Sequence, residues 1–90
     1  MLRPRATSAF KKDWKRAGRR GKELAKLDRV MQRLANEERL EPQLRDHQLT
    51  GVWEGFRECH LESDWLLMYR VQGEEVTFVR TGTHADLFEE

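Results

Sequence analysis

The sequence predicts an α+β fold in which a basic helical hairpin is followed by a small antiparallel β-sheet. The first forty residues repeat apolar side chains at helical spacing, whereas short runs typical of strands follow the Gly51–Gly55 segment. A chain of 90 residues has room for one hydrophobic core. Three Trp, four Phe and one Tyr supply bulk for that core, so we expect a single domain over residues 1–90.

The helical hairpin is expected to follow a short extended segment. Residues 2–6 contain a proline, which suits an edge strand or an extended lead-in and not a central strand. A first helix is expected over about residues 8–17, with Phe10 and Trp14 four positions apart on its inner face. A second helix is expected over about residues 22–36, where apolar side chains recur every three or four positions. These side chains are Leu24, Leu27, Met31 and Leu34.

The second half of the chain predicts a loop, a three-stranded meander and a short helical turn. The helical pattern breaks over residues 37–50, which we interpret as the loop. The residues 81–88 can hold the helical turn. The strands are expected at about residues 56–61, 65–71 and 75–80.

Charge is distributed unevenly between the two halves. Residues 1–40 carry 13 Lys and Arg against 5 Asp and Glu, a net +8, and residues 41–90 carry 4 against 11, a net −7, which together give +1. A basic surface of this kind favours a polyanionic partner. We expect phosphate contacts from the basic residues of the first helix and the turn after it, with a solvated helix face as the alternative. These residues are Lys11, Lys12, Lys15, Arg16, Arg19 and Arg20.

Cysteine content and hydropathy bear on the compartment. Cys59 is the only cysteine, which excludes an internal disulfide, and no apolar run approaches the length of a membrane span. No apolar segment of the kind found in secretory signals follows the first five residues. We therefore expect a cytoplasmic protein that binds no membrane. Cys59 lies in mid-strand, which favours a small buried hydrophobe over a nucleophilic thiol.

Polar side chains are expected to gather at one edge of the meander. Because an antiparallel sheet reverses at each turn, the end of its first strand (His60), the start of its second (Asp64) and the end of its third (Arg80, followed by His84) lie at the same edge. His47, in the preceding loop, can fold over that edge. The face of the sheet that each side chain occupies does not follow from the pattern, because a bulge near a strand end changes it.

This set of side chains fits the cleavage of RNA. Imidazole titrates near about pH 6.5, so one histidine can accept the proton of a 2′-hydroxyl while another protonates the 5′-oxygen that leaves. The guanidinium of Arg80 matches phosphate oxygens, and an exposed aromatic side chain, Trp65 or Phe88, can stack on an unpaired base. Taken singly, each residue has another explanation: a solvated histidine, a turn-forming aspartate, an arginine that neutralises carboxylates or an aromatic core residue.

A zinc site built from the three histidines and Asp64 is the alternative chemistry. The sequence lacks the paired ligand spacing of zinc motifs and has no His-Glu-x-x-His helix. We therefore expect no metal ion and no other cofactor.

Four motifs of the C-terminal half occur in a fixed order. They are Asp46-His47, Gly51-x-Trp53-x-Gly55, His60-x-x-x-Asp64-Trp65 and Arg80-Thr81-Gly82-Thr83-His84-x-x-Leu87-Phe88. In this order they resemble the YafQ branch of the RelE-type bacterial toxins, and the resemblance covers essentially the whole chain, including the basic hairpin. It implies a RelE-like fold of β-α-α-β-β-β order.

The resemblance also implies an activity. Toxins of this branch are ribosome-dependent endoribonucleases that cleave mRNA in the ribosomal A site without a metal. Their partners are the bacterial ribosome, the mRNA and a cognate antitoxin, with which the toxin binds operator DNA. The catalytic set carried over to this chain comprises His47, His60, Asp64, Arg80 and His84, with Phe88 beside it.

The resemblance gives some of these residues a role. His84 is the candidate for proton transfer, and Arg80 is the candidate for stabilising the phosphate in the transition state. Trp65 is expected to shape either the site or the core. The motifs leave the preferred codon open.

Two other functions are compatible with the residues. One is a non-catalytic regulator that uses the basic hairpin to bind nucleic acid or a partner protein. The other is a ribonuclease that acts on free RNA without the ribosome. Cleavage assays with and without translating ribosomes separate the three.

Overall fold

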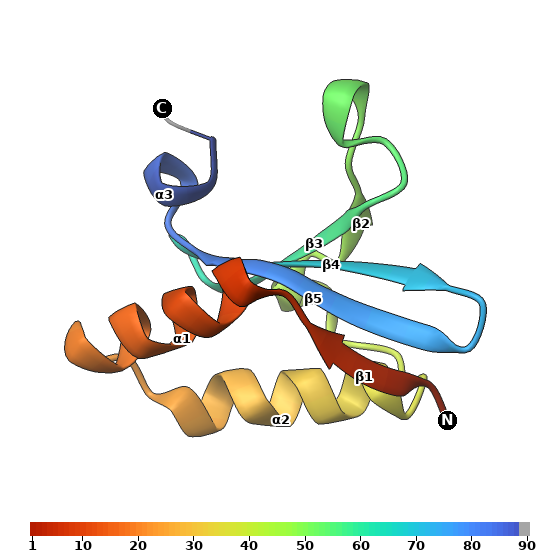
Figure 1. Cartoon of the computed structure of the whole chain (residues 1–90), viewed down its shortest axis with the longest axis horizontal. Coiled ribbons are helices and arrows are strands. Elements are labelled where there is room, and N and C mark those ends of the chain that lie inside the picture. Colours follow the sequence, from red (N-terminus) through yellow and green to blue (C-terminus); the bar gives the residue numbers. More distant parts are fainter. Residues whose placement is uncertain (89–90) are drawn as a thin grey trace.

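Two long helices lie against one face of a five-stranded sheet, and a short third helix and a loop lie over the other face (Figure 1). The structure is a computed structural model that describes residues 1–88. Its elements run in the order β1 (Arg3–Ala6), α1 (Ser8–Arg19), α2 (Leu24–Ala35), β2 (His47–Gln48), β3 (Arg57–Glu62), β4 (Trp65–Gln72), β5 (Glu75–Gly82) and α3 (His84–Phe88). Two short 3₁₀ turns, Pro42–Leu44 and Gly51–Trp53, lie in the segments on either side of β2.

Helix α1 begins at a side-chain cap. The Thr7 hydroxyl accepts a hydrogen bond from the Phe10 backbone N–H at 2.9 Å, which satisfies one of the free amides of the first turn. The helix continues two residues beyond the expected end, to Arg19, and the chain then turns at Gly21 with a φ of 82°. Its inner face buries Phe10, which packs on Phe78 of β5 with 6.0 Å between the ring centroids.

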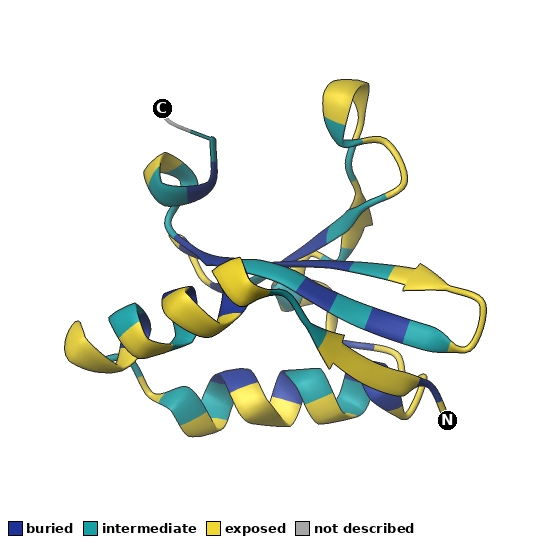
Figure 2. Ribbon diagram, in the orientation of Figure 1, coloured by how far each residue is buried: buried dark blue, intermediate teal, exposed yellow. Residues whose placement is uncertain are grey.

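Helix α2 confirms the predicted apolar repeat. Leu27, Val30 and Leu34 are buried on its inner face, while the outer faces of both helices remain exposed (Figure 2). The helix begins at Leu24, two residues later than expected, and Asn36 forms its C-cap.

The sheet is mixed, so the expectation of a purely antiparallel sheet is wrong at one edge. The strand order is β1-β5-β4-β3-β2, and β1 runs parallel to β5 with Arg3 opposite Glu75. The three-stranded meander β3-β4-β5 is antiparallel, as predicted. The predicted loop before it holds a short extra strand, β2, in which His47 pairs with Glu58.

Both faces of the central strand are covered. Leu67 and Tyr69 lie in the core between the sheet and helices α1 and α2, whereas Leu66 and Met68 pack in a second cluster with Leu87 of α3. Residues 65–69 are therefore all buried, which explains why this strand has a continuous apolar run instead of an alternating one.

A β-bulge near the end of β5 changes the face on which Arg80 lies. Tyr69 pairs with Phe78, but the adjacent Met68 pairs with Arg80, so Val79 is the extra residue. Phe78 points into the core beneath the helices. Without the bulge Arg80 would share that face with Phe78, because side chains alternate along a strand. With it, Arg80 lies opposite Met68 on the other face.

Candidate active site

The sheet register aligns site residues in a row across four strands. His47 of β2 pairs with Glu58 of β3, Glu58 with Met68 of β4, and Met68 with Arg80 of β5. Directly paired residues of antiparallel strands lie on the same face, and neighbouring strands are about 4.8 Å apart. The row therefore places an imidazole at one end and a guanidinium at the other, with buried Met68 as the floor between them.

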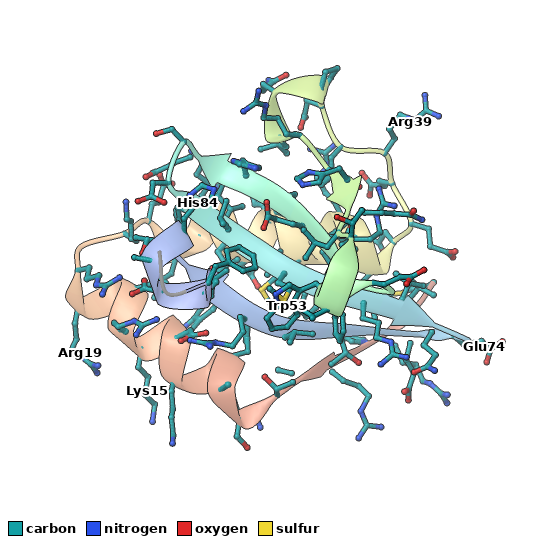
Figure 3. The ribbon with its side chains drawn as sticks, turned by 90° about the horizontal axis from the view of Figure 1, so that it is seen from above. Lys15, Arg19, Arg39, Trp53, Glu74 and His84 are labelled. Atoms are coloured by element: carbon teal, nitrogen blue, oxygen red, sulfur yellow. The ribbon has the colours of Figure 1, made fainter. Side chains whose placement is uncertain are left out.

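The three histidines converge, as the meander predicts. The ring centroids of His47 and His60 are 6.0 Å apart, and those of His60 and His84 are 5.8 Å apart. His60 comes from β3 and His84 is the first residue of α3, which lies above the sheet in Figure 1 and is seen from above in Figure 3. His60 and His84 are far apart in sequence, and the pairing of β3, β4 and β5 brings them together.

Glu58 joins two of these histidines and was missed by the sequence analysis. Its side chain is buried, and its Oε1 atom lies 3.5 Å from Nε2 of His47 and 3.3 Å from Nε2 of His60. A signal for it was present, because Glu58 and His60 are two residues apart on a strand and therefore share a face. A buried carboxylate between two imidazoles stabilises whichever of them carries a proton.

The second nitrogen of His47 is also engaged. Its Nδ1 atom lies 2.6 Å from the backbone carbonyl of Arg45, which can only accept a hydrogen bond. Nδ1 therefore carries the hydrogen in this geometry. Nε2 can then donate to Glu58 only when the ring is protonated.

Asp64 orients His84. Its Oδ1 atom accepts hydrogen bonds from the His84 backbone N–H at 2.8 Å and from Nδ1 of the same residue at 2.7 Å. These bonds, the backbone one first, hold the pKa of the Asp64 carboxyl below its usual range. Because Nδ1 donates to a carboxylate, Nε2 is the nitrogen left to exchange a proton with a bound molecule.

Replacing Asp64 with Asn should slow any reaction that uses His84 as an acid or base by about 10- to 100-fold. The loss of about 10⁴ found for a buried aspartate of a catalytic triad is larger, and we expect less here because Asp64 is exposed. Because the pKa of Asp64 is lowered, its carboxylate stays ionised throughout the neutral range, so this loss should be seen there. Rate measurements from pH 5 to 9 check it. Glu62→Gln, which removes a carboxylate from the end of β3 that pairs with Lys22, is the matched control and should retain the rate.

Helix α3 is fastened at its start by a capping box. The Thr83 hydroxyl accepts from the Asp86 backbone N–H at 3.0 Å, and Asp86 accepts from the Thr83 N–H at 2.9 Å. Asp86 also pairs with Arg20 of the α1 C-cap at 2.7 Å, and this bond lowers the pKa of the Asp86 carboxyl far below its usual range. Gly82 leaves room for Asp86, since a β-carbon at position 82 would lie 2.7 Å from its Oδ2 atom.

Arg80 is bound by a carboxylate from α1. Its Nε and Nη2 atoms donate to the two oxygens of Asp13 at 2.6 and 3.1 Å, and this pairing raises the pKa of the guanidinium. Asp13 is only 4% exposed and was also missed by the sequence analysis. Arg80 thus lies on the site face, but the structure does not bring it into direct contact with a histidine.

The two aromatic candidates differ in their surroundings. Trp65 is 1% exposed and its Nε1 atom donates to the Thr81 hydroxyl at 3.1 Å, so the expectation of an exposed base-stacking side chain is wrong at this position. Trp65 packs in the core between the helices and the sheet. Phe88 is half-buried on the other face and meets Trp53 edge to face, with 6.0 Å between the ring centroids.

The basic residues of α1 fall into two groups. Arg16 and Arg20 form ion pairs with Asp13 and Asp86. Lys15 and Arg19 point outward from α1, away from His84 (Figure 3). Within residues 1–88 no ion pair involves this outward-facing group, which comprises Lys11, Lys12, Lys15 and Arg19.

Two further features bear on alternative chemistry. His47, Glu58 and His60 offer one ligand atom each within 4.8 Å of one another, a set that can hold a transition-metal ion. Cys59 is fully buried beneath the helices, and burial raises the pKa of its thiol to about 12, which makes it an inert core residue. Among residues 1–88 no helix has the length and apolar character needed to cross a membrane.

Comparison with known proteins decides the family. The profile of the family described as "Bacterial toxin of type II toxin-antitoxin system, YafQ" matches residues 2–89. The chain belongs to the YafQ toxin family. The "mRNA interferase toxin YafQ" of Escherichia coli strain K12 is 42% identical over 80 residues, which cover 88% of this chain and 87% of that protein.

Solved structures of two bacterial toxins share the fold. A copper-bound mutant toxin from Helicobacter pylori superimposes with a TM-score of 0.93 at 38% identity, covering 98% of this chain and 100% of that one. The toxin of the E. coli DinJ–YafQ toxin–antitoxin complex superimposes with a TM-score of 0.88 at 39% identity, covering 98% and 99%. The predicted α+β class, with two N-terminal helices packed on a sheet, is confirmed.

Proposed function

We propose that this YafQ-family toxin is an endoribonuclease that cleaves mRNA in the A site of the translating ribosome. The observation that carries the proposal is the convergence of three histidines on one sheet face, with Asp64 bonded to His84 and Arg80 in the same strand row. The 42% identity to an E. coli mRNA interferase supports the substrate class.

The proposed reaction needs two proton transfers and one charged stabiliser. The 2′-hydroxyl loses its proton and attacks the adjacent phosphorus, the bond to the 5′-oxygen breaks, and that oxygen takes up a proton. The products are a 2′,3′-cyclic phosphate and a 5′-hydroxyl end. His84 exchanges one of these protons through Nε2, and the His47–Glu58–His60 group exchanges the other. Arg80 balances the additional negative charge of the phosphorane.

The outward-facing basic group of α1 supports binding to a large polyanion. Lys11, Lys12, Lys15 and Arg19 are exposed on the flank of the molecule, clear of the site. Such charges speed encounter and make binding depend on salt, without selecting a sequence. We propose that they contact ribosomal RNA while Phe88, at the other end of α3 from His84, contacts the message.

An antitoxin is the proposed regulatory partner. A protein 39% identical to this chain forms a toxin–antitoxin complex with DinJ. By the same arrangement a cognate antitoxin would bind this toxin and hold it inactive, and the complex would bind operator DNA.

The experiment is a cleavage assay in a purified translation system. A defined message is incubated with the toxin, with and without ribosomes stalled at a known codon, and its 5′ ends are mapped by primer extension. We expect cleavage only with ribosomes and only at the A-site codon. Equal cleavage of free RNA would identify a ribosome-independent ribonuclease, and an intact message with the toxin bound to ribosomes would identify a non-catalytic regulator.

We also propose that the reaction needs no metal, because imidazole, carboxylate and guanidinium groups cover both proton transfers and the charge. EDTA should leave the ribosome-dependent rate unchanged, once magnesium for the ribosome is restored. Added Cu²⁺ or Zn²⁺ should slow it, because an ion on His47, Glu58 and His60 occupies the lone pairs that move protons. A rate that falls with EDTA and returns with zinc would contradict the proposal.

A further inference from the structure

A buried aspartate on the basic helix contacts Arg80, a residue of the proposed site, from outside the histidine cluster. Asp13 belongs to α1, yet its side chain points inward and is 4% exposed. A carboxylate in such a place is costly unless every lone pair is used. Lysine and arginine residues flank it along the sequence, so the sequence alone does not predict that this acid turns inward.

Asp13 accepts four hydrogen bonds. Oδ2 accepts from Nε of Arg80 at 2.6 Å and from the Thr81 backbone N–H at 3.1 Å, and Oδ1 accepts from Nη2 of Arg80 at 3.1 Å and from Nη2 of Arg16 at 3.0 Å. The carboxylate thus fixes one edge of the Arg80 guanidinium and the backbone of the next residue. Because the planar guanidinium is hydrogen-bonded along its Nε–Nη2 edge, it is held in one orientation. Its Nη1 atom forms no hydrogen bond within residues 1–88.

The contact does not cancel the positive charge of the region. Arg16 lies 3.5 Å from Asp86, which Arg20 binds at 2.7 Å. Three arginines and two aspartates therefore alternate in one series of ion pairs, in the order Arg80, Asp13, Arg16, Asp86 and Arg20, with a net charge of +1. This series links β5, which carries Arg80, to α3, which carries His84.

We propose that Asp13 is a positioning residue, which holds the Arg80 guanidinium in the orientation that receives the scissile phosphate. This rests on the proposed function. A displacement of a catalytic group by about 1 Å can cost about 100-fold in rate, so the grip on Arg80 matters even though Asp13 touches no substrate. The packing of Phe10 on Phe78 already joins α1 to β5, so the fold has a separate source of cohesion at this interface.

The test is a double-mutant cycle in the ribosome-dependent cleavage assay. Asp13→Asn should lower the rate at saturating ribosomes by about tenfold, with little change in the half-saturating concentration, because binding is set elsewhere. Arg80→Ala should lower it further. The double variant should be no slower than Arg80→Ala, because the proposed effect of Asp13 on the rate is exerted through Arg80. Asp28→Asn, the same change at an exposed α2 carboxylate bonded to Gln32, is the matched control.

The outcomes are distinguishable. If the two losses multiply in the double variant, or if Asp13→Asn alone keeps the wild-type rate, the inference is overturned while the proposed function stands. If Arg80→Ala keeps the wild-type rate, the assigned role of Arg80 falls and this inference with it. Should Asp13→Asn fail to fold in a thermal melt, Asp13→Glu keeps the charge but displaces the carboxylate. It should still lose rate severalfold, and a wild-type rate would overturn the inference.

Discussion

Replacing His84 with Ala is expected to lower the rate of A-site cleavage by about 10²- to 10⁴-fold, the usual contribution of one positioned acid or base. Nδ1 of His84 is bound by Asp64, and its Nε2 atom forms no hydrogen bond within residues 1–88, which leaves that nitrogen to exchange a proton. Single-turnover cleavage of a ribosome-bound message measures the effect. The fold should survive, because Asp64 bonds the backbone N–H of residue 84, which alanine retains.

A second variant separates proton transfer from hydrogen bonding. His84→Gln can still donate a hydrogen bond to Asp64, but an amide does not exchange a proton near neutral pH. It should therefore lose about as much rate as His84→Ala. If the Gln variant kept most of the wild-type rate, His84 would be a structural donor, and both proton transfers would fall to the His47–Glu58–His60 group.

Replacing Trp65 with Ala should destabilise the fold by about 3–5 kcal/mol, the cost of removing a large aromatic side chain from a core. Trp65 is almost fully buried and donates to Thr81, which in turn donates to the Leu66 carbonyl. Because the total free energy of unfolding of such a domain is about 5–15 kcal/mol, this loss would greatly raise the fraction of unfolded molecules. Urea unfolding followed by circular dichroism gives the free energy.

The same variant decides between a core residue and a base-stacking one. Val52→Ala, at a side chain that is 93% exposed in the loop over the sheet, should leave the unfolding midpoint unchanged. Trp65→Phe keeps most of the volume and should cost about 1–2 kcal/mol. A Trp65→Ala protein that unfolded like wild type but bound ribosomes poorly would restore Trp65 to the substrate-binding surface.

Much of the fold could be predicted because its signals are local. The leucine repeat of α2 and the turns of the meander depend on neighbours in the sequence, and both were confirmed to within two residues. The convergence of the histidines could also be predicted, because it requires only that successive strands of the meander run in opposite directions. The exposure of Trp65 was mispredicted because a sheet covered on both faces loses the alternation that separates inside from outside.

The remainder of the site depends on contacts between distant residues. Asp13 and Arg80 are 67 positions apart, and nothing in a helix rich in lysine indicates that its one acid turns inward. The bulge at Val79, which decides the face of Arg80, has no glycine or proline to mark it. Glu58 is the exception, since its spacing from His60 on β3 was a usable signal.

The strand row from His47 to Arg80 has a consequence for biosynthesis. Its members come from β2, β3, β4 and β5, and β1 completes the sheet by pairing with β5 across some seventy residues of chain. Contacts this remote in sequence form late, after loop closure over most of the chain. A nascent polypeptide halted anywhere before β5 has emerged lacks Arg80, His84 and the edge that holds β1. Under the proposed function, a nascent toxin therefore cannot assemble its site, and cannot cleave the message of the ribosome that makes it, until β5 and α3 have left the exit tunnel and folded.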